Sequence, residues 1–580
     1  MKNNINTKLY NFKSQFRNKV IGLVRSVPFV DSHIQRIRRK ILSRYGGYPD
    51  WSNIMAIDKN LKKKLQHGIY RKQKVLMATS IGAHLPAMQM ETTLAVALIQ
   101  RGAMVDALLC DGVLPGCQMC EPRFFSNVKR FVSFGPSKDL CSDCFKPGRR
   151  NYEHIRVNSH AYSDNLLKEE MEYADEVSRE VELAEIENFE LYGLSLGEHA
   201  KAGALRFFAR ATIDDEPFGE QVLRRYLKAA ILTAISVKRL LEREKYDVVV
   251  FHHGIYVPQG IIGEVARQQG VRVVNWNPAY RKNCFIFSHG DTYHHTLMDE
   301  PVSAWENMDW PPEREETISR YLRSRWEGEN DWIRFTENPY FEKDRILAEI
   351  GCDTSRPIIG CLTNVMWDAQ LHYPANAFPN MLEWLLHTVR YFQERTDLQL
   401  VIRVHPAEIR GSVPTRQPVV EELKKHFPQL PSNISIVPPE SNISTYVLSE
   451  LCDAVIIYGT KTGVELTSVG IPVIVAGEAW IRNKGVTSDV DSIEGYESIL
   501  NELPLSNRLP AATIARAKKY AYHFFFRRMI PIEVFEKGPG WPPYRFVGKL
   551  ADLEVGSDAG LDCVCEGILD GKPFIFDSSP

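Results

Sequence analysis

The chain has 580 residues, of which 44% are hydrophobic and 25% are charged, and its formal net charge at pH 7 is -1. This composition is typical of a globular protein, and the length predicts two to four domains. A net charge so close to zero disfavours a dedicated nucleic-acid-binding protein, because such proteins usually carry a strong basic excess. The chain contains no run of about 18 apolar residues, which is the length needed to span a membrane. Its N-terminus does not resemble a secretory signal. We therefore expect a cytoplasmic protein that does not bind nucleic acid.

Residues 1–50 differ from the rest of the chain. Before Pro49 there are 11 basic residues and a single acidic one, Asp31. Apolar residues recur among them at roughly helical spacing, which predicts a basic amphipathic helix. Such a helix can lie on an anionic membrane leaflet, or it can pack on the protein with its charged face in water. Both interpretations stay open, so the expected location includes the inner face of the plasma membrane.

A first series of strands and helices extends over residues 70–300. Residues 75–79 are typical of a buried strand, residues 90–101 show helical spacing of apolar side chains, and residues 104–109 are typical of a second strand. Gly102 lies between the helix and the second strand, where a C-cap glycine belongs. The pattern is that of a βαβ unit with a parallel, Rossmann-like sheet. It returns further along, at residues 247–251, 258–269 and 271–275.

A second series occupies residues 351–500, after a connection at residues 301–350 that is rich in Trp, Glu, Arg and Pro. Its apolar runs alternate with short helical patterns, which predicts a second Rossmann-like lobe. Residues 501–580 are expected to form C-terminal helices and a tail that crosses back to the first lobe. Two such lobes bind a ligand in the cleft that faces the carboxyl ends of both sheets.

Two motifs at consecutive strand ends carry the strongest chemical signal. The first, at residues 400–408, ends a hydrophobic strand in a cation, an imidazole and a carboxylate. The second, at residues 457–465, leads from a strand through a small polar turn into a helix. Hydroxyls, backbone N–H groups and a lysine at such a turn form an anion site. The glycines of the turn let a phosphate approach the backbone. A carboxylate one helical turn later suits a hydrogen bond to a ribose diol. The predicted donor-binding residues are Arg403, His405, Glu408, Gly459, Thr460, Lys461, Thr462 and Glu465.

These motifs, followed by Gly470-Ile-Pro-Val-Ile-Val475, resemble the donor lobe of bacterial capsule-polysaccharide enzymes with the GT-B fold, in which two Rossmann-like lobes face a cleft. Kdo transferases, bacterial sialyltransferases and CDP-glycerol polymerases show a similar arrangement. The resemblance covers residues 357–476 and implies that His405, Thr460 and Thr462 contact the donor phosphate. Lys461 departs from it, since many relatives carry a small residue there, and this leaves the identity of the donor open.

The first lobe offers candidates for the catalytic base. His84 follows the first strand in a turn similar to the Gly-His-x-x-Pro turn of many GT-B enzymes, although its spacing to Pro86 is shorter. A histidine with a pKa near neutral is suited to removing a proton from an acceptor hydroxyl. Glu91 and Asp111 are the alternatives, and a purely structural His84 also stays open. Weaker candidates near the cleft are His252, His253, His294 and His295.

Five cysteines near the second strand form a separate feature. Cys117 and Cys120 make one Cys-x-x-Cys pair, Cys141 and Cys144 make another about twenty residues later, and Cys110 lies just upstream. This spacing suits a tetrahedral structural zinc site in an insertion at about residues 110–145. An iron–sulfur cluster uses similar ligands, and free buried thiols remain the third alternative.

The sequence thus predicts a glycosyltransferase that transfers a sugar from a nucleotide-sugar donor to a growing capsule or other surface polysaccharide. The acceptor is expected to be a saccharide or a lipid-linked saccharide. No carboxylate nucleophile is evident, which favours inversion, and no DxD-type carboxylate pair follows a strand, so we expect no catalytic cofactor. The rivals are a glycerol-phosphate transferase or sugar-nucleotide epimerase with the same donor lobe, and a non-catalytic subunit of a polysaccharide assembly complex.

Overall fold

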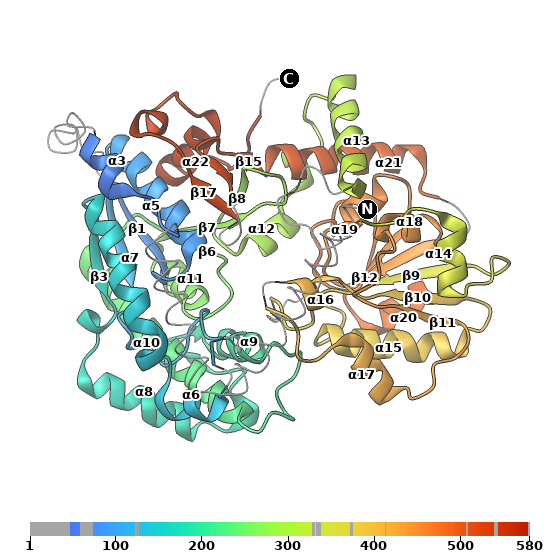
Figure 1. The fold of residues 1–580 in the computed structure, drawn as a ribbon, viewed down its shortest axis with the longest axis horizontal. Coiled ribbons are helices and arrows are strands. Elements are labelled where there is room, and N and C mark those ends of the chain that lie inside the picture. Colours follow the sequence, from blue (N-terminus) through green and yellow to red (C-terminus); the bar gives the residue numbers. More distant parts are fainter. Residues whose placement is uncertain are drawn as a thin grey trace, which may run out of the picture.

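The computed structural model describes residues 47–57, 73–121, 124–125, 127–327, 331, 338–369, 371, 375–411, 413–505, 508–538 and 543–577. Nearly all of the predicted N-terminal basic segment, residues 1–50, lies outside them. Within the described part, no helix has both the length and the apolar composition needed to cross a bilayer. The chain forms two α/β lobes that lie side by side, and the end of the chain, from β15 (Ile530–Pro531) to α22 (Ala559–Asp570), lies on the first of them (Figure 1).

The first lobe is built on a seven-stranded sheet with the strand order β15-β8-β7-β6-β1-β2-β3. Strands β3, β2, β1, β6 and β7 pair in parallel, whereas β8 and β15 run antiparallel to their neighbours β7 and β8. The first six strands of this sheet therefore follow the order 3-2-1-4-5-6 of a Rossmann fold. Their bounds are β1 (Lys74–Ser80), β2 (Met104–Leu109), β3 (Asn158–Ala161), β6 (Val248–His252), β7 (Arg272–Pro278), β8 (Cys284–His289) and β15 (Ile530–Pro531).

The second lobe repeats this order in a six-stranded sheet, β11-β10-β9-β12-β13-β14, in which every strand pair is parallel. In both lobes the strand order reverses beside the first strand, between β1 and β6 and between β9 and β12. Ligands of open α/β sheets bind outside the carboxyl ends of the strands at this reversal. The bounds are β9 (Ile358–Leu362), β10 (Gln399–Arg403), β11 (Ile434–Val437), β12 (Ala454–Ile457), β13 (Val473–Val475) and β14 (Ser488–Asp489).

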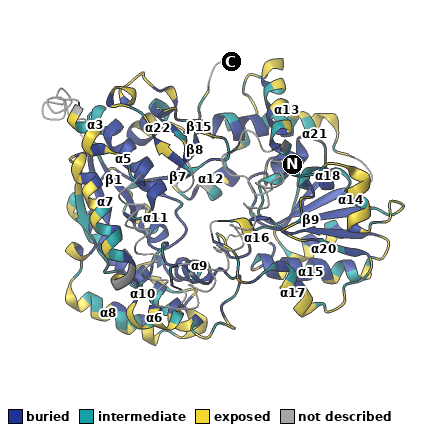
Figure 2. Ribbon diagram, in the orientation of Figure 1, coloured by how far each residue is buried: buried dark blue, intermediate teal, exposed yellow. Residues whose placement is uncertain are grey.

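Helices cover both faces of each sheet, so the central strands are buried along their whole length (Figure 2). This burial explains why those strands are continuous apolar runs without alternation. One face of the first sheet packs on α5 (Leu85–Gln100), α7 (Ser142–His154) and α22 (Ala559–Asp570), and the other on α9 (Gly197–Phe208), α10 (Gly219–Glu244) and α11 (Gln259–Gln268). The second sheet packs on α15 (Met381–Glu394), α17 (Val419–His426) and α20 (Ile493–Asn501), and opposite on α13 (Pro312–Glu327), α14 (Lys343–Ile350), α18 (Thr445–Glu450), α19 (Thr462–Thr467) and α21 (Ala511–Tyr522).

The α/β architecture with two Rossmann-like lobes, as expected from the sequence, is confirmed. One boundary differs in a way that matters for function. Helix α5 begins at Leu85, more than a turn before the expected start at residue 90, because Pro86 is well suited to the first helical turn. The earlier start makes His84 the N-cap residue of α5.

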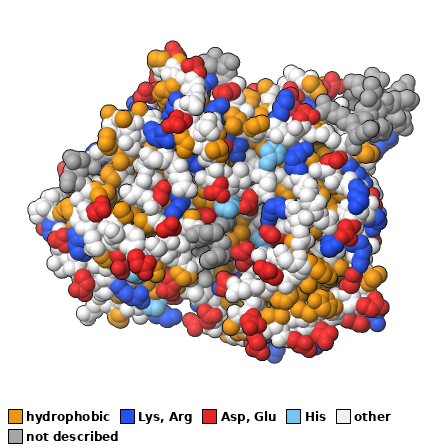
Figure 3. Space-filling model, turned by 180° about the vertical axis from the view of Figure 1, so that it is seen from behind, with side chains coloured by type: hydrophobic (Ala, Val, Ile, Leu, Met, Phe, Trp, Pro, Cys, Tyr) orange, Lys and Arg blue, Asp and Glu red, His pale blue; other side chains and the backbone are white. Residues whose placement is uncertain are grey.

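The C-terminal segment ties the two lobes together. After α21, which packs on the second lobe, the chain forms a short π-helix (His523–Arg527) and then adds β15 to the first sheet beside β8. A hairpin of β16 (Phe535–Lys537) and β17 (Tyr544–Phe546) follows, and α22 completes the segment on the first lobe. The face opposite to Figure 1 has acidic and basic side chains interspersed, in keeping with the net charge near zero (Figure 3).

The docking of α22 leaves no room for a side chain at Gly560. A Cβ atom at this position would lie 1.6 Å from the carbonyl oxygen of Pro531 in β15. We expect Gly560→Ala to lower the free energy of unfolding by about 2 kcal/mol or more, because backbone must move. The exposed Glu566→Ala on the same helix serves as the control and should change it by less than about 0.5 kcal/mol. Chemical denaturation checks this, and equal stabilities of the two variants would contradict the close packing.

Candidate active site between the lobes

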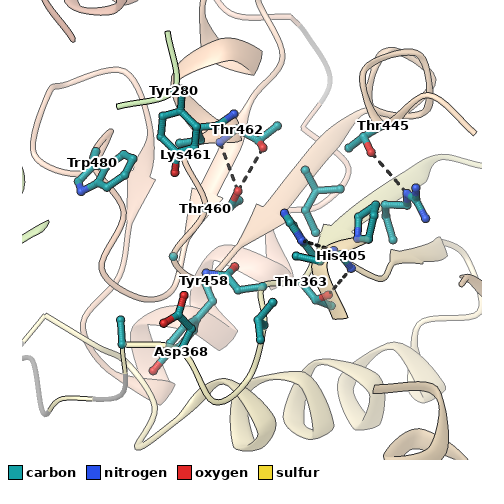
Figure 4. A pocket seen from close by; sticks show the side chains of 18 of the residues that line it. Tyr280, Thr363, Asp368, His405, Thr445, Tyr458, Thr460, Lys461, Thr462 and Trp480 are labelled. Carbon is teal, nitrogen blue, oxygen red and sulfur yellow. Dashed lines mark hydrogen bonds between the residues drawn. The ribbon is translucent and has the colours of Figure 1, made fainter. Parts of the chain in front are cut away.

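A cavity of about 460 Å³ lies at the strand-order reversal of the second sheet. Its walls are the segments that follow β9, β10, β12 and β13, together with Tyr280 and His294 from the first lobe and residues at the end of α13. Figure 4 shows His405, Thr460 and Thr462 around the same space, although they come from two different strand ends. The two sequence motifs of the second lobe therefore face one cavity.

His405 is held in one tautomer by its surroundings. Its Nδ1 accepts a hydrogen bond of 3.0 Å from the backbone N–H of Ala407, and its own backbone N–H donates to Thr363 Oγ1 at 3.1 Å. Burial, with the nearby charges of Lys461 and Arg403, lowers the pKa of His405 to about 4. The ring is therefore neutral at pH 7, and because Nδ1 accepts, Nε2 must carry the proton. His405 offers the cavity a neutral N–H donor rather than a cation.

The turn between β12 and α19 supplies hydroxyls at close range. Thr460 Oγ1 and Thr462 Oγ1 are 3.1 Å apart, and the backbone N–H of Thr462 donates to Thr460 Oγ1 at 3.3 Å. A side chain at Gly459 would be crowded, since a Cβ atom would lie 3.0 Å from the carbonyl oxygen of Glu478. Helix α19 has only 6 residues, so the helix dipole contributes less here than the sequence suggested, and the side chains carry the polarity of the turn.

A buried ion cluster fixes Lys461 at the cavity wall. Its Nζ contacts Glu465 Oε1 at 2.7 Å and lies 4.6 Å from the ring centre of Tyr280. Glu465 also accepts from Arg325 Nε at 3.1 Å and from the hydroxyl of Tyr446 at 2.5 Å. Burial alone would raise the pKa of Glu465, but the charges of Arg325 and Lys461 outweigh it and lower the pKa to about 2. Glu465 is outside the cavity lining, so it orients these cations and does not face a ribose.

The charged groups of two other predicted donor-binding residues, Arg403 and Glu408, are bound to backbone groups of the protein. The guanidinium of Arg403 donates to the carbonyl oxygens of Pro438 at 2.7 Å and Ser441 at 3.1 Å, which fixes the loop before α18. Glu408 accepts the backbone N–H of Val419 at 3.0 Å, at the start of α17. Arg403 borders the cavity but Glu408 does not. Both residues shape the walls of the site rather than present charge to a ligand.

The cavity has aromatic and acidic walls, of which the sequence indicated only His294. Trp326 and Tyr446 stack with ring centres 5.5 Å apart, and His294 stacks on Trp480 at 4.9 Å. Asp368, in the loop after β9, accepts a hydrogen bond of 2.6 Å from the hydroxyl of Tyr256 in the first lobe. These residues come from both lobes and from the connection, so only tertiary structure brings them together. Within the sequence, the position of Asp368 shortly after a strand is the one feature that could have indicated its place at the site.

A row of rings leads from the strand-order reversal of the first sheet toward this cavity. The ring centres of His84 and His252 are 4.8 Å apart, those of His252 and His253 are 5.4 Å apart, and that of Tyr256 lies 5.2 Å from His253. Burial, and then the charges of His252 and Arg206, lowers the pKa of His84 well below its usual value. Its Nδ1 is buried and has no hydrogen-bond partner among the described residues. His84 is therefore neutral at pH 7, and it lies outside the lining of the cavity, at the first-lobe end of the row.

Glu91 and Asp111 lie in different surroundings. Glu91 is buried within α5, where Trp276 Nε1 donates to it at 3.1 Å and the hydroxyl of Thr79 also bonds to it. Burial raises its pKa to about 7. Glu91 thus fixes α5 against the sheet, and an acceptor could not reach it without displacing the core. Asp111 is half-buried beside Cys110 at the end of β2.

The predicted metal ligands Cys117, Cys120, Cys141 and Cys144 come together with Cys110, as described further below. Among the described residues, the one group with metal-ligand spacing is Asp106, His160 and Glu244. That group already encloses a cation, since Lys74 Nζ lies 3.4 Å from Asp106 and 2.7 Å from Glu244. It is therefore an ordinary ion-pair network.

The comparisons with known proteins agree with the chemistry of the second lobe. Residues 323–505 match the family model described as capsule polysaccharide biosynthesis protein, which confirms the resemblance found in this part of the sequence. No curated protein sequence matches the chain.

Solved structures resemble the fold more distantly. The β-Kdo 2,4 transferase of Thermosulfurimonas dismutans KpsC is 12% identical over 48% of this chain and 80% of its own, with a TM-score of 0.32. The β-Kdo 2,7 transferase of the same KpsC is 13% identical over 57% and 89%, with a TM-score of 0.30. The UDP-GlcNAc 2-epimerase of Methanocaldococcus jannaschii is 11% identical over 78% and 99%, with a TM-score of 0.23. Because these TM-scores are low, we draw nothing about activity from them.

Arg325 tests whether the buried ion cluster supports the cavity. Replacing it with Met leaves both Asp331 and part of the Glu465 charge uncompensated in the interior. We expect Arg325→Met to lower the free energy of unfolding by about 3–5 kcal/mol, because an unpaired buried charge is costly. Arg320→Met on the same helix removes an exposed pair with Glu316 and should cost less than about 1 kcal/mol. Denaturant unfolding measures both variants. If Arg325→Met lowers the free energy of unfolding no more than Arg320→Met does, the ion cluster does not stabilise the fold.

Proposed function

We propose that the protein is a glycosyltransferase of surface-polysaccharide synthesis, and that it binds the phosphate of a nucleotide-sugar donor in the cavity of the second lobe. The observation that carries this proposal is the convergence of the His405 N–H donor and the Thr460 and Thr462 hydroxyls on one cavity at the strand-order reversal. The match of residues 323–505 to capsule polysaccharide biosynthesis proteins supports it.

The donor site combines neutral hydrogen-bond donors with cations held in place. When the bond to the sugar breaks, negative charge grows on the departing nucleotide, and preorganised donors stabilise it in a site where water is excluded. His405 and the two threonine hydroxyls bond to phosphate oxygens, while Lys461 supplies positive charge from the wall. The stacked pair of Trp326 and Tyr446 offers an aromatic surface for the nucleobase.

The acceptor lies between the lobes, over the ring row of the first lobe. An inverting transfer needs a base that takes the proton of the acceptor hydroxyl while its oxygen attacks the anomeric carbon. His84 is our first candidate, because it is neutral and its Nδ1 is unpartnered among the described residues. Asp368 is the second candidate, because it lines the cavity and faces the first lobe through Tyr256. Capsule or lipid-linked saccharides at the inner face of the membrane remain the proposed acceptors.

The donor assignment predicts a specific loss of binding in His405→Ala. A hydrogen bond to a charged group contributes about 1.5–3 kcal/mol, so this variant should bind its nucleotide-sugar about 10- to 100-fold more weakly. The control His426→Ala removes a histidine at the end of α17, outside the cavity. The measurement is calorimetry or thermal shift with CMP-, UDP-, GDP- and CDP-linked sugars. Unchanged affinity in His405→Ala, or no stabilisation of the natural protein by any donor, would contradict the assignment.

The base is identified by comparing His84→Asn with Asp368→Asn. Loss of the base lowers kcat by about 10²- to 10⁴-fold with little effect on donor affinity. If His84 is the base, the protein should keep full activity as the pH falls through 6.5, because the pKa of His84 is lowered. Activity should be lost only at a lower pH, where the imidazole binds a proton. His154→Asn, an exposed histidine of α7, is the control. A large loss in Asp368→Asn alone would transfer the role to Asp368.

A further inference from the structure

Five cysteines gather at one place in the first lobe, beside the loop that carries His84. They come from three segments: Cys110 follows β2, Cys117 and Cys120 lie in the next loop, and Cys141 and Cys144 lie at the start of α7. All five are free thiols, and each is buried or half-buried. Gly112, two residues after Cys110, lies against Cys141, because a Cβ atom on Gly112 would be 3.7 Å from Cys141 Sγ, so the segment that follows β2 meets the start of α7 at this place.

A backbone N–H group is directed at one of these sulfurs, since the amide of Ala83 donates to Cys144 Sγ at 3.2 Å. Such a donor stabilises the negative charge of a thiolate, which is the form in which a cysteine binds a metal.

The spacing of the sulfurs also fits metal ligation in part. Cys117 Sγ and Cys120 Sγ are 3.9 Å apart, and two sulfurs at about 2.3 Å from one tetrahedral ion are about 3.8 Å apart. Among the described residues, no three of the sulfurs lie within 4.8 Å of one another. The second Cys-x-x-Cys pair therefore lies farther from the first than the ligands of a single tetrahedral ion do. This separation would suit an iron–sulfur cluster, or a zinc site whose sulfurs move closer together when the ion binds.

The loop of Cys117 and Cys120 is fixed by groups outside the cysteine cluster. The hydroxyl of Tyr226 donates to the carbonyl oxygen of Cys117 at 3.1 Å, and Arg206 bonds to the carbonyl oxygen of Gln118. The opposite side is equally tight, because Gly82 and Gly148 touch backbone to backbone, with a Cβ on Gly148 only 2.6 Å from Gly82 Cα. The sulfurs therefore converge within a rigid frame rather than in an open loop.

We propose that these five cysteines form a thiolate-bound metal centre, with four of them as ligands and the fifth in reserve beside it. Thiolates select zinc or iron–sulfur clusters among biological metals. The centre holds α7 against the turn of residues 80–86, through the contacts of Cys144 with Ala83 and of Gly148 with Gly82. It is a positioning element for the His84 turn, and its existence does not depend on the proposed sugar transfer.

The experiment measures metal in the full-length protein purified without oxygen and without chelators. We expect about one zinc per chain with no visible absorption, or about four irons with a broad visible band if the centre is an iron–sulfur cluster. The metal content of the double variant Cys117→Ser/Cys144→Ser should be at least about tenfold lower than that of the natural protein. Cys352→Ser, a half-buried cysteine of the second lobe, is the matched control and should retain it.

A measurement on the unmodified protein covers the case in which the double variant does not fold. Titration of the thiols with a mercurial should release the metal to a chromogenic chelator as the cluster reacts. Less than about a tenth of an equivalent of metal in the natural protein, an unchanged content in the double variant, or a Cys117–Cys120 disulfide would overturn the proposal. Donor binding is measured separately, so failure here leaves the proposed function untouched.

Discussion

The carboxylate of Glu465, which is 2% exposed, is the interaction on which the second-lobe site depends. It lies between Arg325 of the lobe connection, Lys461 of the β12–α19 turn and Tyr446 of α18. A buried charge without such partners would destabilise the fold, so the three segments are constrained to meet at this point. Their meeting fixes the cationic wall of the cavity and places Trp326 against Tyr446. The site is thus preorganised before any ligand binds, which is what stabilising a departing nucleotide requires.

Burial keeps His84 of the first lobe and His405 of the second lobe neutral. His405 can only donate from Nε2, because its Nδ1 accepts from Ala407. His84 keeps a buried Nδ1 with no hydrogen-bond partner among the described residues. In the proposed transfer, His405 would donate a hydrogen bond to the donor phosphate and His84 would take the proton of the acceptor hydroxyl. Desolvation keeps both rings without a permanent charge.

The cysteine cluster gives the first lobe a second fixed point near the same loop. The turn of residues 80–86 is bounded by α5 on one side and by Cys144 and Gly148 of α7 on the other. Side chains of this insertion, among them Phe125, Phe131 and Leu140, are buried in the core of the first lobe. The proposed thiolate ligation would add to this packing beside the turn that carries His84.

The sequence by itself determined the two Rossmann-like lobes, because continuous apolar runs separated by helical patterns permit few other arrangements. It also determined that His405, Thr460 and Thr462 share a site, since carboxyl ends of neighbouring parallel strands meet at one sheet edge. Only the tertiary structure decided that Arg403, Glu408 and Glu465 support the cavity walls through hydrogen bonds and ion pairs, and that Asp368 and Trp326 line the cavity. Side-chain direction and contacts between segments far apart in the chain set those roles, and neither is encoded in local spacing.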